Sequence, residues 1–134
     1  MHLELSNINS ANFVEQPAID SESLAELRGL PGEDGEELLP RIIEMFLEDA
    51  PKAMIDLDGA LAAGDARAVV RIAHTVKGCG AYFGAHRFQE LCNAMEQAGK
   101  AGDLEPVADL LSQTGHELQR VIAALELEIA CQPI

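Results

Sequence analysis

Apolar residues recur every three or four positions along most of the chain, and polar or charged residues fill the places between them. This spacing puts the apolar side chains on one face of a helix, so the chain predicts helices rather than strands. Four long helices follow, with apolar positions that run from Leu39 to Leu61, Val69 to Phe83, Phe88 to Ala98 and Val107 to Leu125. Because short glycine-containing links join them, we expect an all-α fold, an antiparallel up-and-down four-helix bundle.

A short extra helix is expected ahead of the bundle. Asp20 can cap the sequence SESLAELRGL, which ends at Gly29 and Pro31. Residues 1–18 are polar and irregular, which predicts a flexible N-terminal segment or linker, and residues 19–130 are expected to form the bundle domain. Pro51 lies within the first long helix and should bend or divide it, because proline lacks the N–H that a helix interior uses.

The charge of the chain limits its partners. Its 134 residues include 23 acidic residues and 9 lysines or arginines, which gives a formal net charge of −14. Such a surface repels the phosphates of nucleic acids and of anionic membranes, so we expect neither as a partner. The three cysteines form no paired framework, and no secretion signal or membrane span is visible. We expect a monomeric, cytoplasmic protein.

The stretch AHTVKGCGAYFG, residues 73–84, places a histidine, a lysine and two glycines inside a predicted helix. At about 100° per residue, His74 lies roughly 170° from the apolar stripe of that helix and should face solvent. Lys77, at i+3, lies beside it, and Gly78, at i+4, leaves no side chain next to the ring. A glycine in a helix interior costs roughly 1 kcal/mol relative to alanine, so access to the imidazole is the gain we expect from it.

Basic residues gather around this histidine although the chain as a whole is acidic. No acidic residue falls between positions 66 and 89, whereas four basic residues do: Arg67, Arg71, Lys77 and Arg87. Cations at short range can hold an anion that the rest of the surface would repel. Arg67, Arg71 and Ala81 share the outer face with His74, where they could dock a partner or simply be solvated.

An exposed imidazole beside an ammonium is suited to accept a phosphoryl group. The neutral ring has a nucleophilic nitrogen, and the lysine can hold a phosphoryl oxygen. The chain has no P-loop or glycine-rich loop for ATP, so it should lack autonomous kinase activity and the phosphate must come from a partner. We expect no cofactor, and a metal site built from His74, Cys79, His86 and Cys92 has no recognised ligand spacing.

Counting residues across the predicted hairpin adds a second helix to the site. With a turn at Gly84, His74 and Glu96 lie at about the same height on neighbouring antiparallel helices. Glu96 could accept a proton from the second ring nitrogen and orient the ring, or it could be an ordinary surface charge. Lys100, one turn further along, could add positive potential.

The segment RIAHTVKGCGAYFGAHRFQELCNAME, with MFLEDAPKAMIDLDGALAAGDARAV before it, resembles the histidine phosphotransfer (HPt) domains of two-component phosphorelays. The resemblance covers about residues 20–127. It implies that His74 carries the phosphoryl group on Nε2, that Lys77 is the phosphate-side lysine and that Gly78 is the required small neighbour. Cys79 and Gly80 depart from the family, in which serines are common at these positions.

The resemblance also implies the partners. Receiver domains would exchange phosphate with His74 and bring their own Mg²⁺, and a hybrid histidine kinase could be the source. The alternative is a helical docking module that binds receivers or kinases without carrying phosphate, whereas a hydrolase lacks a nucleophile, base and orienting group. The carrier hypothesis predicts an exposed ring, and it counts burial of the ring, or a Lys77 amine turned away and paired with a carboxylate, as evidence against it.

Overall fold

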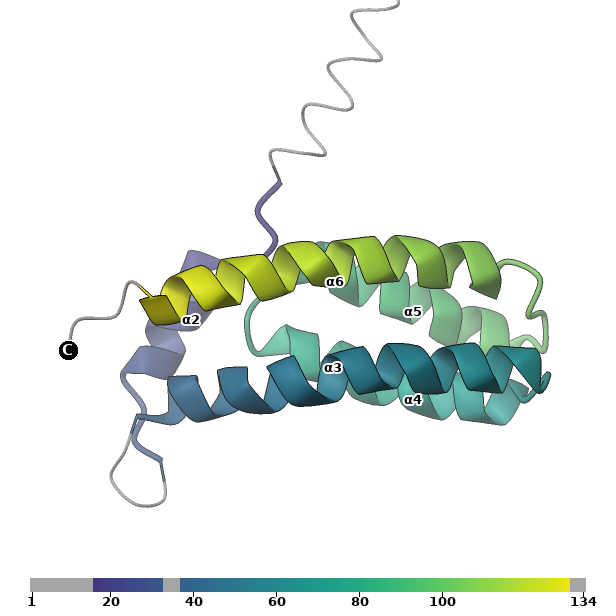
Figure 1. Ribbon diagram of the computed structural model, residues 1–134, viewed down its shortest axis with the longest axis horizontal. Coiled ribbons are helices and arrows are strands. Elements are labelled where there is room, and N and C mark those ends of the chain that lie inside the picture. Colours follow the sequence, from purple (N-terminus) through teal and green to yellow (C-terminus); the bar gives the residue numbers. More distant parts are fainter. Residues whose placement is uncertain (1–15, 33–36, 131–134) are drawn as a thin grey trace, which may run out of the picture.

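The computed structural model describes residues 16–32 and 37–130, so most of the predicted N-terminal segment, residues 1–15, lies outside the described residues. The described residues form five α-helices, which Figure 1 shows along the chain. They are α2 (Ser21–Arg28), α3 (Leu38–Ala62), α4 (Ala66–Ala81), α5 (His86–Lys100) and α6 (Val107–Ala130).

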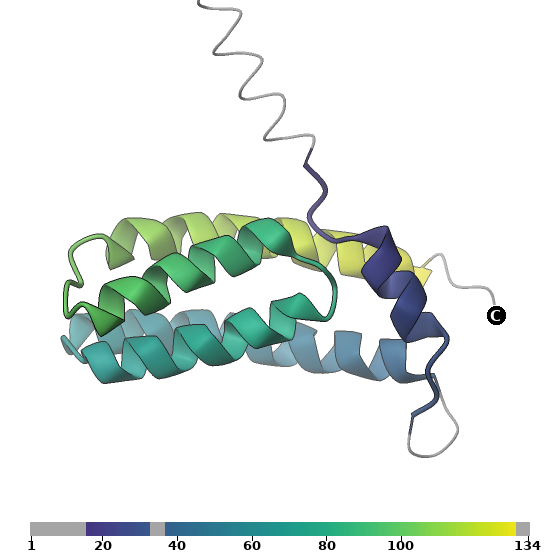
Figure 2. The same cartoon turned by 180° about the vertical axis from the view of Figure 1, so that it is seen from behind.

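The four long helices form the bundle. Each packs against its two neighbours, in the order α3, α4, α5, α6 and back to α3, and successive helices run in opposite directions (Figures 1 and 2). The short helix α2 packs on α3 at one end. The predicted fold class is therefore confirmed, and none of the helices in the described part of the chain is long and apolar enough to cross a membrane.

The helix ends follow the sequence signals. Asp20 caps α2 by accepting from the backbone N–H of Glu22, and Asp65 caps α4 by accepting from that of Ala68. Gly84 turns the chain from α4 into α5 with a φ of 61°, a value that residues other than glycine rarely adopt. A Cβ on Gly84 would also lie 2.4 Å from the Cβ of Asp20, so this tight turn needs glycine on both grounds.

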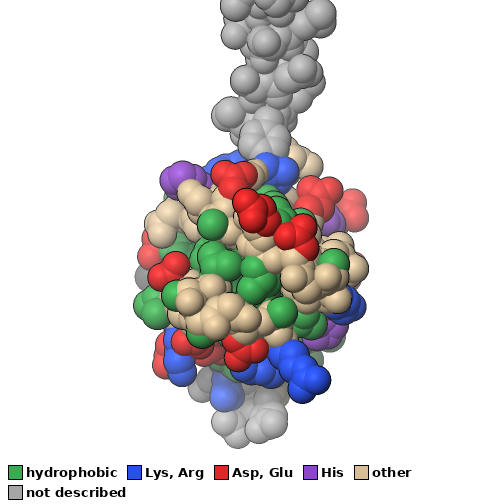
Figure 3. Space-filling model, turned by 90° about the vertical axis from the view of Figure 1, so that its right-hand side faces the viewer, with side chains coloured by type: hydrophobic (Ala, Val, Ile, Leu, Met, Phe, Trp, Pro, Cys, Tyr) green, Lys and Arg blue, Asp and Glu red, His purple; other side chains and the backbone are tan. Residues whose placement is uncertain are grey.

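Three phenylalanines fill the centre of the core. Phe46 of α3 contacts the rings of Phe83 and Phe88 edge-on, with centroids 5.3 and 5.8 Å away. Figure 3 views the bundle from the end formed by the α3–α4 and α5–α6 links. There, apolar side chains reach the surface near the middle and charged ones lie around them.

The predicted apolar stripe of α4 needs a correction. Within the helix the buried residues are Val69, Ala73, Val76 and Gly80. Ile72 and Cys79, which the periodicity placed in the core, are only half-buried, and Phe83 is buried but lies beyond the end of the helix. Small residues face α5 because that helix packs closely: a Cβ on Gly80 would lie 2.8 Å from the ring of Phe88.

Two further expectations need adjustment. Pro51 does not divide α3, which continues from Leu38 to Ala62 while packing against both α4 and α6. The chain just before α2 is packed onto the bundle, since Ala18 is buried and Arg120 of α6 donates to the carbonyl of Gln16 at 2.6 Å. Residues 16–18, expected in the flexible segment, thus lie against the domain.

Candidate functional site

The imidazole of His74 stands on the outer face of α4, as its place in the helix predicts. Its side chain is 68% exposed, whereas Ala73, the residue before it, faces the core and is fully buried. A Cβ on Gly78 would meet no atom within 4 Å, so the space beside the ring is open. The ring is therefore accessible to a partner in the folded domain.

The inner nitrogen of the ring is held by α5. Nδ1 of His74 lies 3.0 Å from Oε2 of Glu96, whose side chain is only 4% exposed, so the expected placement of Glu96 at the height of His74 is confirmed. The hydrogen bond from Lys77 lowers the pKa of Glu96 from 4.5 to about 2; Lys100 and His74 act in the same direction, and burial opposes them.

The charge on Glu96 fixes the proton on the ring. With so low a pKa the carboxylate is ionised near neutral pH, and an ionised carboxylate only accepts hydrogen bonds. Nδ1 must then be the donor in the contact with Oε2, because two acceptors would repel each other. Nε2 carries the lone pair of the neutral ring, which leaves it as the nucleophilic nitrogen.

Lys77 lies beside the ring but is not free. Its Nζ donates to Oε1 of Glu96 at 2.7 Å and to Oδ1 of Asn93 at 3.1 Å, and its side chain is 26% exposed. A Lys77 amine turned away and paired with a carboxylate was expected to count against the carrier, and the amine is indeed paired, with the carboxylate of Glu96. The carboxylate that holds the amine is the one that also holds the imidazole, so the pairing keeps Lys77 at the site instead of drawing it away.

Lys100 completes the cluster around the buried carboxylate. Its Nζ lies 3.2 Å from Oε2 of Glu96, four residues before it on α5, and its side chain is 54% exposed. One carboxylate thus binds two ammonium groups and leaves the cluster with a net positive charge. This local sign is opposite to that of the whole chain, as the run without acidic residues predicts.

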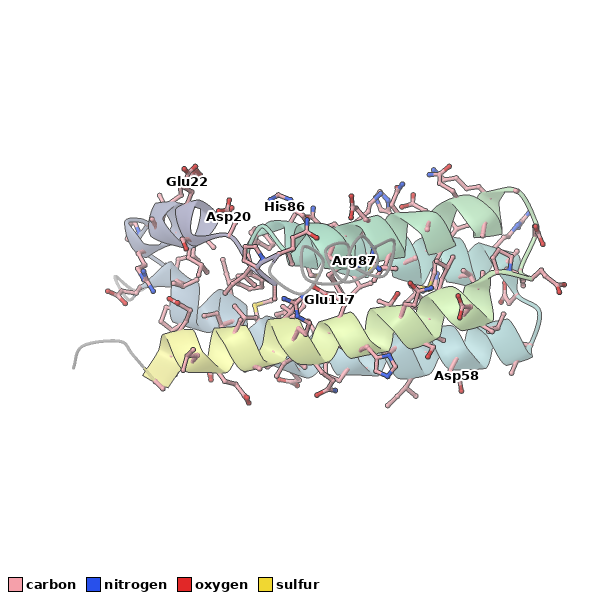
Figure 4. The ribbon with its side chains drawn as sticks, turned by 90° about the horizontal axis from the view of Figure 1, so that it is seen from above. Asp20, Glu22, Asp58, His86, Arg87 and Glu117 are labelled. Carbon is pink, nitrogen blue, oxygen red and sulfur yellow. The ribbon has the colours of Figure 1, made fainter. Side chains whose placement is uncertain are left out.

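The other predicted site residues make no contact with the Glu96 cluster that the structure records. Arg67, Arg71 and Ala81 are all exposed. Arg71 lines a groove of about 250 Å³ between α3 and α4, together with Asp49, Asp56 and Thr75. Arg87 lies at the start of α5, nine residues before Glu96, and does not join the cluster. It donates to Gln113 of α6, and Figure 4 shows it directed toward the stretch of α6 that carries Glu117.

Asn93 is a site residue that the sequence analysis missed. It lies three residues before Glu96, on the exposed side of α5, and its carbonyl oxygen accepts from Lys77. The spacing of three from Glu96 was its only signal, and it becomes visible once the two helices are known to face each other.

Both cysteines in the described part of α4 and α5 have raised pKa values, which favours the thiol over the reactive thiolate. Burial raises the pKa of Cys92 to about 12, and burial together with Asp49 raises that of Cys79. Within the described ranges there is no group of three or more histidine, cysteine, aspartate or glutamate side chains that could hold a metal ion.

Comparisons with known proteins show the family to which the chain belongs. A family model described as "Hpt domain" matches residues 41–126. Among solved structures, the histidine-containing phosphotransfer protein B (HptB) of Pseudomonas aeruginosa PAO1 is 27% identical, covers 89% of this chain and 100% of its own, and superposes with a TM-score of 0.79. A comparison with curated proteins finds no match. The chain belongs to the Hpt domain family and is a phosphotransfer domain of phosphorelays, a phosphocarrier and not a kinase.

Proposed function

We propose that His74 accepts a phosphoryl group on Nε2 from the phosphoaspartate of one receiver domain and passes it to the aspartate of another. The observation that carries this proposal is the contact of Nδ1 with the buried Glu96, because it leaves Nε2 on an exposed ring. The open space at Gly78 supports it, since a receiver must bring its own active site up to the ring.

Transfer of the phosphoryl group from the receiver to His74 needs one bond to form and one to break. Nε2 attacks phosphorus, and the P–N bond forms as the bond between phosphorus and the aspartate oxygen breaks, which returns the receiver's carboxylate. The ring keeps its proton on Nδ1 and becomes positively charged. Glu96, 3.0 Å away and ionised, stabilises that charge, and the same steps in reverse deliver the phosphoryl group to a second receiver.

The two lysines offset the charge that arrives with the phosphoryl group. A phosphoryl group on nitrogen adds about two negative charges beside a carboxylate. Lys77 and Lys100 already lie against that carboxylate, so their ammonium groups can attract phosphoryl oxygens without a large movement. The Mg²⁺ and the acids that bind it would belong to the receiver.

The docking surface that we propose surrounds the ring on α4. Gly78 and Ala81 provide a low floor, and Arg67 and Arg71 are exposed cations for which no ion pair exists within the described ranges. Encounters of this kind bury a modest area and are transient. We further propose that the protein acts as a monomer in the cytoplasm, where receivers are found.

The experiment that tests this function is phosphotransfer from a labelled receiver. We expect wild-type protein to take up acid-labile, alkali-stable label, His74→Ala to take up none, and His86→Ala, which removes another exposed histidine, to label fully. Equal labelling of His74→Ala would refute the carrier. Receiver binding without any label on the wild type would favour the docking module.

A further inference from the structure

The amide of Asn93 bears on the chemistry of the site through a single contact. Its Oδ1 lies 3.1 Å from Nζ of Lys77, on the helix opposite to the one that carries the lysine. No other hydrogen bond of this side chain occurs within residues 16–32 and 37–130, and the residue is exposed. Its contribution to the packing of the bundle is therefore small.

The ammonium of Lys77 has three N–H donors, and two of them are assigned. One points to Oε1 of Glu96 at 2.7 Å and one to Oδ1 of Asn93 at 3.1 Å. The third has no acceptor in the part of the chain that the structure describes. Two fixed donors hold a flexible side chain in one orientation, so the direction of the third is set as well.

The chemistry of the acceptor matters as much as its position. A carboxylate at position 93 would also hold the ammonium, but it would cancel the charge of Lys77 and repel an incoming phosphoryl group. The amide oxygen accepts the same hydrogen bond and leaves the positive charge in place. With Glu96 already supplying one negative charge, a neutral second acceptor keeps the cluster positive.

We propose that Asn93 is a positioning residue for phosphoryl transfer: it holds Lys77 so that its third N–H is directed to a phosphoryl group at Nε2 of His74. This inference rests on the proposed function. It concerns how the lysine is held and leaves open which receiver takes part.

The test compares two substitutions of Asn93 and a matched control in phosphotransfer from a labelled receiver. We expect Asn93→Ala to lower the rate at saturating receiver about three- to tenfold, because a hydrogen bond that orients the lysine is lost. The receiver concentration at half-saturation should not change, since the proposed docking surface lies on α4 and Asn93 on α5. Asn93→Asp should also be slower than wild type. Gln97→Ala is the matched control: it removes an exposed amide from the same helix, one that makes no hydrogen bond to the described residues, and it should transfer at the wild-type rate.

The decisive arm is a double-mutant cycle with Lys77→Met. If Asn93 acts through Lys77, then Lys77→Met/Asn93→Ala should transfer at the same rate as Lys77→Met alone. A structural role would give losses that multiply, and that result would overturn the inference, as would an unchanged rate for Asn93→Ala or for Asn93→Asp. These outcomes are distinct from a failure of the proposed function, in which His74→Ala would label like the wild type.

Discussion

Glu96 is the residue on which the site converges. Its two oxygens bind the imidazole and two lysines, and it is the carboxylate that sets the proton on Nδ1. Its burial alone would favour the neutral acid, so the cations that surround it decide its charge. At the scale of one residue, the fold therefore keeps an ionised group under an exposed nucleophile.

The low pKa of Glu96 makes a prediction for acid stability. A carboxyl whose pKa falls from 4.5 to about 2 on folding contributes stability that is complete above pH 5 and is lost as the pH falls through 2. Glu96→Gln lacks this contribution. We expect the difference in free energy of unfolding between wild type and Glu96→Gln to be largest near pH 6 and to shrink between pH 5 and pH 2.5, measured by urea denaturation.

A difference that stayed constant over that range would mean that the carboxyl is not held ionised by its neighbours. Asp58→Asn is a control for the loss of an exposed carboxylate, and its stability difference from wild type should stay small at every pH.

At the scale of the element, α4 presents two opposite faces with different needs for glycine. Gly78 opens the solvent side next to His74, and Gly80 lets α5 approach on the core side. Because an α-helix has 3.6 residues per turn, residues two positions apart point to nearly opposite sides. Gly78 and Gly80 therefore have different roles.

Matched substitutions separate these two glycines. Gly78→Ala places a methyl group in open space, so it should raise the free energy of unfolding by about 0.5–1 kcal/mol while raising the receiver concentration needed for half-maximal transfer. Gly80→Ala presses on the fully buried ring of Phe88 and should lower stability by about 1–3 kcal/mol. Denaturant midpoints and transfer rates check both. A destabilised Gly78→Ala would contradict the account of the open face.

Two features could be predicted from the sequence: the helices, and the placement of His74 and Glu96 at the same level of the α4–α5 hairpin. Both depend on the apolar periodicity and on the positions of the turns, which can be read from the sequence. The core face of α4 was placed incorrectly because the analysis followed large residues, whereas the helix buries the small residues Ala73 and Gly80, and Gly80 lies against the ring of Phe88. The pairing of Lys77 was also missed. It depends on how far a long side chain reaches across to another helix, and no pattern within one helix reports that.

At the scale of the whole molecule, the bundle has a second group of buried polar contacts that lies away from its reactive face. Within the described residues α6 packs on α3 and α5 but not on α4, so it lies across the bundle from His74. There Arg120 donates to the buried carboxylate of Glu117 and to the carbonyl of Gln16, which fastens the chain ahead of α2. Substitutions in this α6 cluster should therefore change stability without changing transfer.

Arg120→Ala tests that separation. It leaves Glu117, only 5% exposed, without the guanidinium that binds it and frees the carbonyl of Gln16, so we expect the free energy of unfolding to fall by about 1–3 kcal/mol. The rate of phosphotransfer, measured where the variant is fully folded, should equal that of the wild type. Arg28→Ala removes an exposed ion pair with Glu128 and should cost less than about 1 kcal/mol. A slower transfer by Arg120→Ala would contradict this prediction. Since α6 does not contact α4, the change would then have to reach the site through another helix of the bundle.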